Sequence, residues 1–195
     1  MKKNGDEIII DKLCKYYGGN AVIKDFSLAL TPGRAFCLMA PSGAGKTTLF
    51  RILLGLESPD SGTIRGLSTH QISAVFQEDR LLEGYTALQN LHLVTGHQYT
   101  NMELTNILLN LLPEDALKKP VCEFSGGMKR RTAILRALLA PFSFLIMDEP
   151  FTGLDYETRL KTISLIKKYT KGKILLVSTH LEEDISLLEA SLIRL

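Results

Sequence analysis

The stretch that decides the fold is "AFCLMAPSGAGKTTLFRILLGL", residues 35–56. It opens with five apolar residues in a row, which is typical of a strand buried in the centre of a sheet. From Lys46 onward the apolar residues recur at helical spacing, and Gly55 stands near the end of that helix. A glycine-rich turn therefore joins a buried strand to a helix, which predicts an α/β fold.

That turn, "APSGAGKTT" at residues 40–48, has the composition of a phosphate site. It follows the pattern G-x-x-x-x-G-K-[ST], with Ala40 in place of the first glycine. Its glycines let backbone N–H groups wrap phosphate oxygens, and the helix start adds partial positive charge. Lys46 suits the β- and γ-phosphates, and the Thr47 hydroxyl suits Mg²⁺. The predicted nucleotide contacts are Pro41, Ser42, Gly43, Ala44, Gly45, Lys46, Thr47 and Thr48.

A second apolar strand ends in two acids, in "FLIMDEP" at residues 144–150. Ligands of open α/β sheets bind beyond the carboxyl ends of the strands, so Asp148 and Glu149 should lie beside the glycine-rich turn. Asp148 suits Mg²⁺, directly or through water, and Glu149 can orient and deprotonate an attacking water. Phosphoryl transfer to water needs mainly positioning and charge neutralisation. These residues therefore predict ATP hydrolysis.

The remaining periodicity predicts one domain over residues 1–195, in which a helical insertion interrupts an α/β core. The core covers residues 1–80 and 140–195, and the helical subdomain covers about 81–139. The predicted strands are 7–13, 22–30, 35–39, 72–76, 142–147 and 173–179; the predicted helices are 46–56, 100–113, 128–139 and 156–169; residues 58–62 are predicted to form a loop. On the helix at 128–139, the arginines Arg130, Arg131 and Arg136 are expected on the outer face.

The composition excludes several classes of protein. Lys and Arg number 23 and Asp and Glu 21, so the net charge of +2 lacks the basic bias of general nucleic-acid binders. No apolar run reaches the ~18 residues of a membrane span, and the first ten residues lack the apolar core of a signal peptide. The scattered cysteines Cys14, Cys37 and Cys122 predict a reducing compartment, with neither a disulfide framework nor a zinc site.

The order of the motifs resembles that of the ATP-binding cassette (ABC) ATPases. The most specific motif is "FSGGM" at 124–128, which is similar to the family signature L-S-G-G-Q and precedes "LIMDEP". Further pieces in family order are "YYGGNAVIKDFSL" (16–28), "VFQ" (75–77), "FTGLD" (151–155) and "VSTH" (177–180). The resemblance covers about residues 7–195. It implies a P-loop NTPase core with a mostly parallel central sheet, a small N-terminal antiparallel β portion and an inserted α-helical subdomain.

The resemblance also assigns residues, with ATP and Mg²⁺ as cofactors. Gln77 is expected near Mg²⁺ and the attacking water, and His180 near the γ-phosphate. Tyr17 is expected to stack on adenine, with Tyr16 as the second candidate. Family members pair head to tail, so a homodimer is expected in which one copy contacts the ATP of the other through Ser125, Gly126, Gly127 and Asp155.

Phe124 and Met128 depart from the signature without replacing its Ser-Gly-Gly. Met128 and "VFQEDRLL" at 75–82 are similar to ATPases of nitrate/sulfonate/taurine-type importers. Because no membrane span is present, a transport role implies separate transmembrane permease subunits. Separate subunits are most like those of bacterial importers, although some exporters share the arrangement. The expected role is an import subunit, peripheral on the cytoplasmic face of the cell membrane, with a solute-binding protein as a further partner. The apolar residues after "VFQ" either line a groove for a permease helix or pack in the core of the insertion; they are Leu81, Leu82 and Tyr85.

Two functions other than a transport subunit are alternatives. A soluble ABC-type ATPase switch could act on another protein or on nucleic acid, although near-neutral charge argues against strong attraction to a phosphate backbone. A nucleotide-binding regulator without hydrolysis is disfavoured, because Lys46, Asp148, Glu149 and His180 are all present. The chain ends fifteen residues after His180, as expected of a minimal cassette. The other histidines have no place in the motifs and are expected to be solvated; they are His70, His92 and His97.

Overall fold

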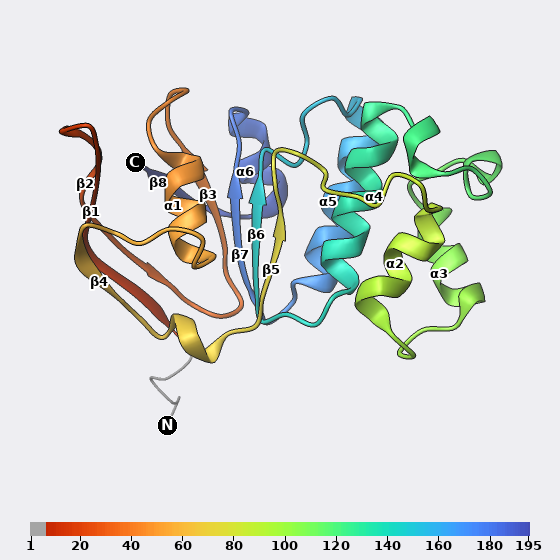
Figure 1. Ribbon diagram of the computed structural model, residues 1–195, viewed down its shortest axis with the longest axis horizontal. Coiled ribbons are helices and arrows are strands. Elements are labelled where there is room, and N and C mark those ends of the chain that lie inside the picture. Colours follow the sequence, from red (N-terminus) through yellow and green to blue (C-terminus); the bar gives the residue numbers. More distant parts are fainter. Residues whose placement is uncertain (1–6) are drawn as a thin grey trace.

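The computed structural model describes residues 7–195, apart from the side chain of Thr69. Its centre is a parallel sheet in the order β5-β6-β7-β3-β8 (Figure 1). The strands are β3 (Ala35–Met39), β5 (Ile72–Val75), β6 (Phe144–Asp148), β7 (Ile174–Ser178) and β8 (Ser191–Arg194). Every residue of β6 and β7 is buried, which explains their continuously apolar sequences.

A small antiparallel sheet lies beside the central one, in the order β2-β1-β4. It contains β1 (Ile8–Tyr17), β2 (Asn20–Leu30) and β4 (Ser61–Arg65). The loop prediction for 58–62 is wrong at its end, because Ser61 and Gly62 begin β4. Gly62 has φ +92°, and a Cβ there would lie 2.5 Å from the Lys12 carbonyl oxygen. Glycine therefore permits this close pairing with β1.

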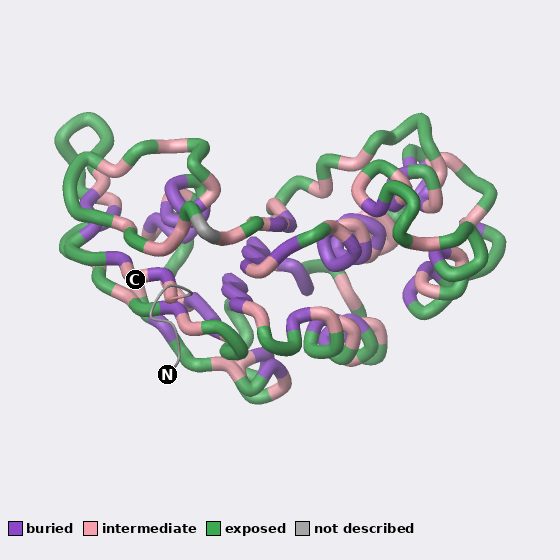
Figure 2. The backbone as a smooth tube through the Cα atoms, turned by 90° about the horizontal axis from the view of Figure 1, so that it is seen from below, coloured by how far each residue is buried: buried purple, intermediate pink, exposed green. Residues whose placement is uncertain are grey.

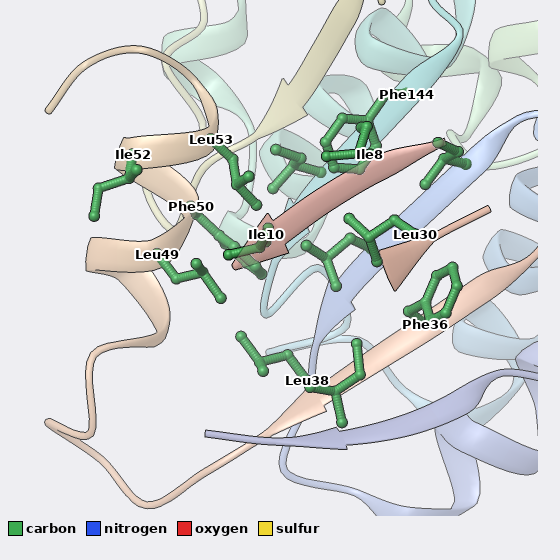
Figure 3. Close-up of a cluster of buried hydrophobic side chains, with 14 of the residues drawn as sticks. Ile8, Ile10, Leu30, Phe36, Leu38, Leu49, Phe50, Ile52, Leu53 and Phe144 are labelled. Atoms are coloured by element: carbon green, nitrogen blue, oxygen red, sulfur yellow. The ribbon is translucent and has the colours of Figure 1, made fainter. Parts of the chain in front are cut away.

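Helix α1 (Lys46–Leu53) packs between the two sheets. Figure 3 shows its Leu49 and Phe50 side chains in one buried cluster with Ile8 of β1 and Phe144 of β6. Each fully buried side chain of this kind stabilises the fold by about 1.5–3 kcal/mol. The cluster thus fixes the turn before α1 against the central sheet.

The insertion contains α2 (Ala87–Thr95), α3 (Asn101–Leu108) and α4 (Gly126–Leu139), which gather around a leucine-rich cluster of their own. Helix α3 is shorter than the predicted 100–113, because tighter turns follow Leu108 before Pro113. Helix α4 links insertion and core: Leu135 packs in the insertion, whereas Ile134 packs against the sheet. Short 3₁₀ turns lie at Leu67–Thr69, Glu114–Ala116 and Val121–Glu123.

The chain ends with α5 (Tyr156–Tyr169), α6 (Glu182–Leu188) and β8. Helix α5 has the predicted bounds, whereas α6 and β8 had no sequence prediction. Seen from below, the buried segments run through the middle of the molecule, and loops at both ends are exposed (Figure 2). None of the helices within residues 7–195 is both long and apolar enough to cross a membrane. The predicted α/β fold class, with its parallel sheet, small antiparallel sheet and inserted helices, is confirmed.

Candidate nucleotide site

The glycine-rich turn has the backbone that its sequence predicts. Gly43 has φ +80° and Gly45 has φ +96°, both in the left-handed region. A Cβ at Gly45 would lie 2.9 Å from the Val22 carbonyl oxygen, so glycine is required there by space as well as by conformation. Gly45 caps α1, whose first turn holds no acidic residue. The partial positive charge of the helix start is therefore not offset locally.

Lys46 folds back over this turn. Its side chain is buried, and Nζ donates to the carbonyl oxygens of Ala40 at 2.8 Å and Pro41 at 3.3 Å. These two hydrogen bonds compensate for the hydration that the ammonium group loses when it is buried. They hold a positive charge against the loop that Gly43 and Gly45 shape.

Asp148 is held on both of its carboxylate oxygens. Thr47 Oγ1 donates to Oδ2 at 2.9 Å, and Ser178 Oγ donates to Oδ1 at 2.6 Å. The parallel register between β6 and β7 sets Asp148 directly beside Ser178, which explains the second bond. Ser178 was not predicted as a site residue; its only sequence signal is its position in "VSTH".

Glu149 and His180 meet just beyond the strand ends. Glu149 has φ +47°, a conformation that costs a non-glycine residue about 1–3 kcal/mol. Its backbone N–H donates to Ser178 Oγ at 2.8 Å, which helps to hold that conformation. A 2.7 Å hydrogen bond joins Glu149 Oε1 to His180 Nε2. The left-handed turn therefore aims the carboxylate away from β6 and toward the loop after β7.

A hollow of about 200 Å³ lies among these groups. It is lined by Ser42, Gly43, Gly45, Lys46, Thr47, Thr48, Gln77 and Glu149. The structure thus brings the glycine-rich turn, the Glu149 carboxylate and Gln77 around one space, at the carboxyl edge of the sheet.

Gln77 is exposed at this hollow, and its backbone is held from α4. Arg130 Nη1 donates to the Phe76 carbonyl oxygen at 2.6 Å, and Nη2 donates to that of Gln77. Arg130 Nε also pairs with Asp79 Oδ1 at 3.2 Å. The expectation that Arg130 lies on the outer face is wrong, because only 8% of the residue is exposed. Its burial follows from these contacts with residues 76–79, which helical periodicity cannot reveal.

Tyr17 lies at the end of β1 with 46% of its surface exposed. Its hydroxyl donates to the Glu57 carboxylate, and this bond raises the Tyr17 pKa. A weaker contact with the Thr48 hydroxyl places Tyr17 next to the first turn of α1. Tyr16 is exposed to a similar degree, at 43%. Stacking of Tyr17 on adenine stays a prediction.

The signature residues do not join this hollow in the same chain. In Figure 1, α1 lies to the left of β5, β6 and β7, and α4 and α5 lie to the right of these strands. Ser125 caps α4 by accepting from the Met128 N–H at 3.3 Å, and Asp155 caps α5 by accepting from the Thr158 N–H at 2.9 Å. That backbone bond lowers the Asp155 pKa.

The starts of α4 and α5 lie side by side. A Cβ at Gly127 would lie 3.4 Å from the carbonyl oxygen of Gly153. Ser125 and Gly126 are exposed, and Gly127 is partly buried by this approach. One exposed edge therefore carries Ser125, Gly126, Gly127 and Asp155.

Several other predicted residues divide between core and surface. Phe124 is buried in the insertion, and Leu81 packs against the same cluster. Leu82 and Tyr85 are exposed, at 42% and 50%. Of the remaining histidines, His97 is solvated as expected. The expectation is wrong for two that are partly buried: His70 Nδ1 lies 2.9 Å from Ser143 Oγ, and His92 Nε2 lies 2.7 Å from Asn101 Oδ1.

Known proteins are similar to this chain in sequence and in architecture. The family model described as "ABC transporter" matches residues 23–152. The chain belongs to the ABC transporter family. A curated relative, the Nod factor export ATP-binding protein I of Paraburkholderia xenovorans LB400, is 38% identical over 91% of this chain and 64% of its own length. That of Rhizobium etli is 36% identical over 87% of this chain and 59% of its own length.

This member of the family thus spans about three fifths of the length of the curated relatives it matches. Among solved structures, an ATP-binding subunit of an ABC transporter superposes with a TM-score of 0.85 at 25% identity, over 96% of this chain and 85% of its own. A dimeric ATP-binding cassette in a post-hydrolysis state, bound to ADP and Pi, gives 0.80 at 26% identity, over 96% and 94%. The relatives' names give no support to the expected similarity to importers.

Proposed function

We propose that this chain is the ATP-binding and ATP-hydrolysing subunit of an ABC exporter. The observation that carries the proposal is the convergence of five side chains from three segments, the start of α1, the end of β6 and the loop after β7, at one edge of the sheet. They are Lys46, Thr47, Asp148, Glu149 and His180. Transfer of a phosphoryl group to water requires positioned positive charge and a group that orients the water, and this set supplies both.

Glu149 is assigned as the general base. His180 engages its Oε1, and its Oε2 has no hydrogen bond to the described part of the chain. Oε2 is therefore the atom assigned to accept the proton of the attacking water. His180, through the same contact, fixes the direction of the carboxylate. Lys46 is assigned to the β- and γ-phosphates. Its Nζ would leave the carbonyl oxygens of Ala40 and Pro41 and bind the phosphate oxygens instead.

The residues around Asp148 fit a magnesium ion. A buried carboxylate, a hydroxyl and an amide oxygen are the hard ligands that Mg²⁺ takes, and Thr47 already contacts Asp148. Thr47, Asp148 and Gln77 would hold the ion, which in such sites neutralises charge on the β- and γ-phosphate oxygens.

The second half of the site is assigned to another copy of the chain. Ser125, Gly126 and Gly127 present a helix start on an exposed edge, and their helix α4 lies away from α1 of the same chain. Helix starts attract anions, so this edge suits the γ-phosphate held by a facing copy. The solved cassette bound to ADP and Pi is itself described as dimeric, which supports the assignment.

Export, rather than the import favoured by the sequence, is proposed because both curated relatives are named for export. The chain would act at the cytoplasmic face of the membrane on separate transmembrane subunits. Leu82 and Tyr85, two exposed apolar residues that follow Gln77 in the sequence, suit such a contact. Co-expression with the membrane protein encoded beside this chain should bring the chain into the membrane fraction. Recovery in the soluble fraction only would contradict the transport role.

The catalytic assignment is tested with Glu149→Gln. The amide cannot accept the water proton, so turnover should fall by about 10²–10⁴-fold, while ATP binding is retained. Steady-state ATPase rates and equilibrium binding of a fluorescent ATP analogue measure the two effects. Glu157→Gln, which neutralises an exposed acid on α5, is the matched control and should behave as the parent chain. Turnover near the parent rate in Glu149→Gln would refute the role of Glu149.

A further inference from the structure

A buried carboxylate lies behind the turn that carries His180. Asp184, in the first turn of α6, is 0% exposed. Its Oδ2 accepts a hydrogen bond from Thr179 Oγ1, and its Oδ1 lies 3.6 Å from Arg159 Nε. Burial of a carboxylate costs several kcal/mol unless partners offset it. The partners of Asp184 therefore indicate what the residue does.

The Thr179 hydroxyl closes the turn around His180. Thr179 Oγ1 accepts from the Leu181 N–H at 3.2 Å, so one oxygen bridges the residues on either side of the histidine. The same hydroxyl donates its single proton to Asp184. An ionised carboxylate can only accept, so Asp184 fixes where that proton points. The lone pairs of the hydroxyl are then left for Leu181.

Asp184 is itself held from several elements. Arg159 of α5 is 7% exposed, and it contacts Asp184 and the Glu183 carboxylate of α6. Burial, with a lesser contribution from the charge of Asp184, raises the pKa of the Cys37 thiol of β3. Burial raises the pKa of Asp184, while the Thr179 bond and the charge of Arg159 oppose the rise. The Asp184 carboxylate is thus buried and held by contacts with α5 and with the turn before α6.

Asp184 and the catalytic pair border the same small space. A cavity of about 80 Å³ is lined by Glu149, His180, Thr179 and Asp184, among others. We infer, given the proposed ATPase function, that Asp184 acts through Thr179 as a positioning residue for His180. It sets the turn in which His180 Nε2 meets Glu149 Oε1. The contact between His180 and the base is then fixed from behind, by residues outside the family motifs named above.

The inference is tested on the complete chain with two substitutions of Thr179. Thr179→Val keeps the shape and removes the hydroxyl, whereas Thr179→Ser keeps the hydroxyl. Misplacement of a catalytic group by about 1 Å can cost on the order of 10²-fold, so Thr179→Val should lower kcat by about 10–100-fold. KM for ATP should stay within about twofold, since the phosphate-binding turn is untouched. Thr179→Ser should restore most of the rate, and a kcat for Thr179→Val within about twofold of the parent would overturn the inference.

The carboxylate is tested by Asp184→Leu against a matched control. Asp184→Leu should reproduce the loss of kcat seen in Thr179→Val, because the hydroxyl proton is then free to point elsewhere. Asp184→Asn keeps an acceptor oxygen and should show a smaller loss. Glu182→Gln removes an exposed acid from the same helical turn and should leave kcat unchanged. Equal losses in Asp184→Leu and Glu182→Gln would mean that only helix charge matters.

A second measurement does not depend on turnover. The chain has four histidines, so the ¹H–¹³C signals of the imidazole rings are few, and His180→Ala identifies that of His180. Thr179→Val should move or broaden the His180 signal alone, and Thr179→Ser should leave it in place. An unmoved His180 signal in Thr179→Val would overturn the positioning role. Absence of ATPase activity in the parent chain would instead refute the proposed function, and the His180 signal would still decide the positioning.

Discussion

The hollow around Lys46 and the edge around Ser125 are both built at helix starts, yet they differ in completeness. The hollow is lined by the glycine-rich turn, the start of α1, Gln77 and Glu149, and the neighbouring Asp148 is buried and doubly hydrogen-bonded. The edge is exposed, and its Ser125 and Asp155 only cap their own helices. The first arrangement can hold an anion within one chain, whereas the second requires something to cover it. The contrast supports the proposed division of the site between two copies.

The largest effect is expected from removal of the positive charge of Lys46 at the hollow. Lys46→Ala takes away the cation assigned to the β- and γ-phosphates and should weaken ATP binding by about 10²-fold or more. Isothermal titration calorimetry measures the affinity, with Lys161→Ala on the surface of α5 as the matched control. An ATP affinity equal to that of the control would show that the hollow around Lys46 is not the nucleotide site.

The exposed edge is tested by Ser125→Arg in a Glu149→Gln background. ATP binding by the single chain should change by less than about twofold, because the edge does not join the hollow of its own chain. ATP-dependent dimerisation, followed by light scattering on a sizing column, should be lost. Ser186→Arg, at an exposed position of α6, controls for added bulk and charge. An ATP-dependent dimer that persists in Ser125→Arg would contradict the proposal that the exposed edge contacts the ATP of a second copy.

The link between the two regions is Arg130, which joins α4 to the backbone of residues 76–77. Arg130→Met keeps the apolar stem and removes three polar contacts. The free energy of unfolding should fall by about 1–3 kcal/mol, because the Phe76 and Gln77 carbonyl oxygens and the Asp79 carboxylate lose a charged donor. Urea denaturation measures the change. A stability equal to that of the parent would show that Gln77 is held without α4.

The smallest effect concerns cysteine chemistry. Burial, with a lesser contribution from Asp184, raises the pKa of the Cys37 thiol to about 12. At pH 8 its reactive thiolate is then roughly one part in 10⁴, whereas Cys122 is exposed. Maleimide labelling of the native chain, followed by mass spectrometry, should modify Cys122 first and spare Cys37. Raising the pH toward 10 should increase the Cys37 thiolate about 100-fold, to only about one part in 10², so Cys122 should still react first. Rapid labelling of Cys37 at pH 8 would contradict its burial.

The residues that the sequence located correctly share a local cause. The apolar run before Ala40, the glycines at 43 and 45 and the lysine after them each act through backbone conformation or helix geometry. Such effects depend on neighbours in the chain, so they are visible in a string of residues. Helix α5 and the two carboxylates at the end of β6 belong to the same class, and their predicted positions along the chain agree with the structure.

What only the tertiary structure decided depends on contacts between distant segments. Ser178 meets Asp148 because β6 and β7 pair in one register, and no local pattern specifies that register. Arg130 is buried by residues 76–79, against the outward position that helical periodicity predicts. Asp184 is an ordinary acid in sequence, and only packing against Arg159 and Thr179 makes it a buried support for the His180 turn. Sequence thus specified the glycine-rich turn, and long-range packing determined how the side chains proposed for catalysis are oriented around it.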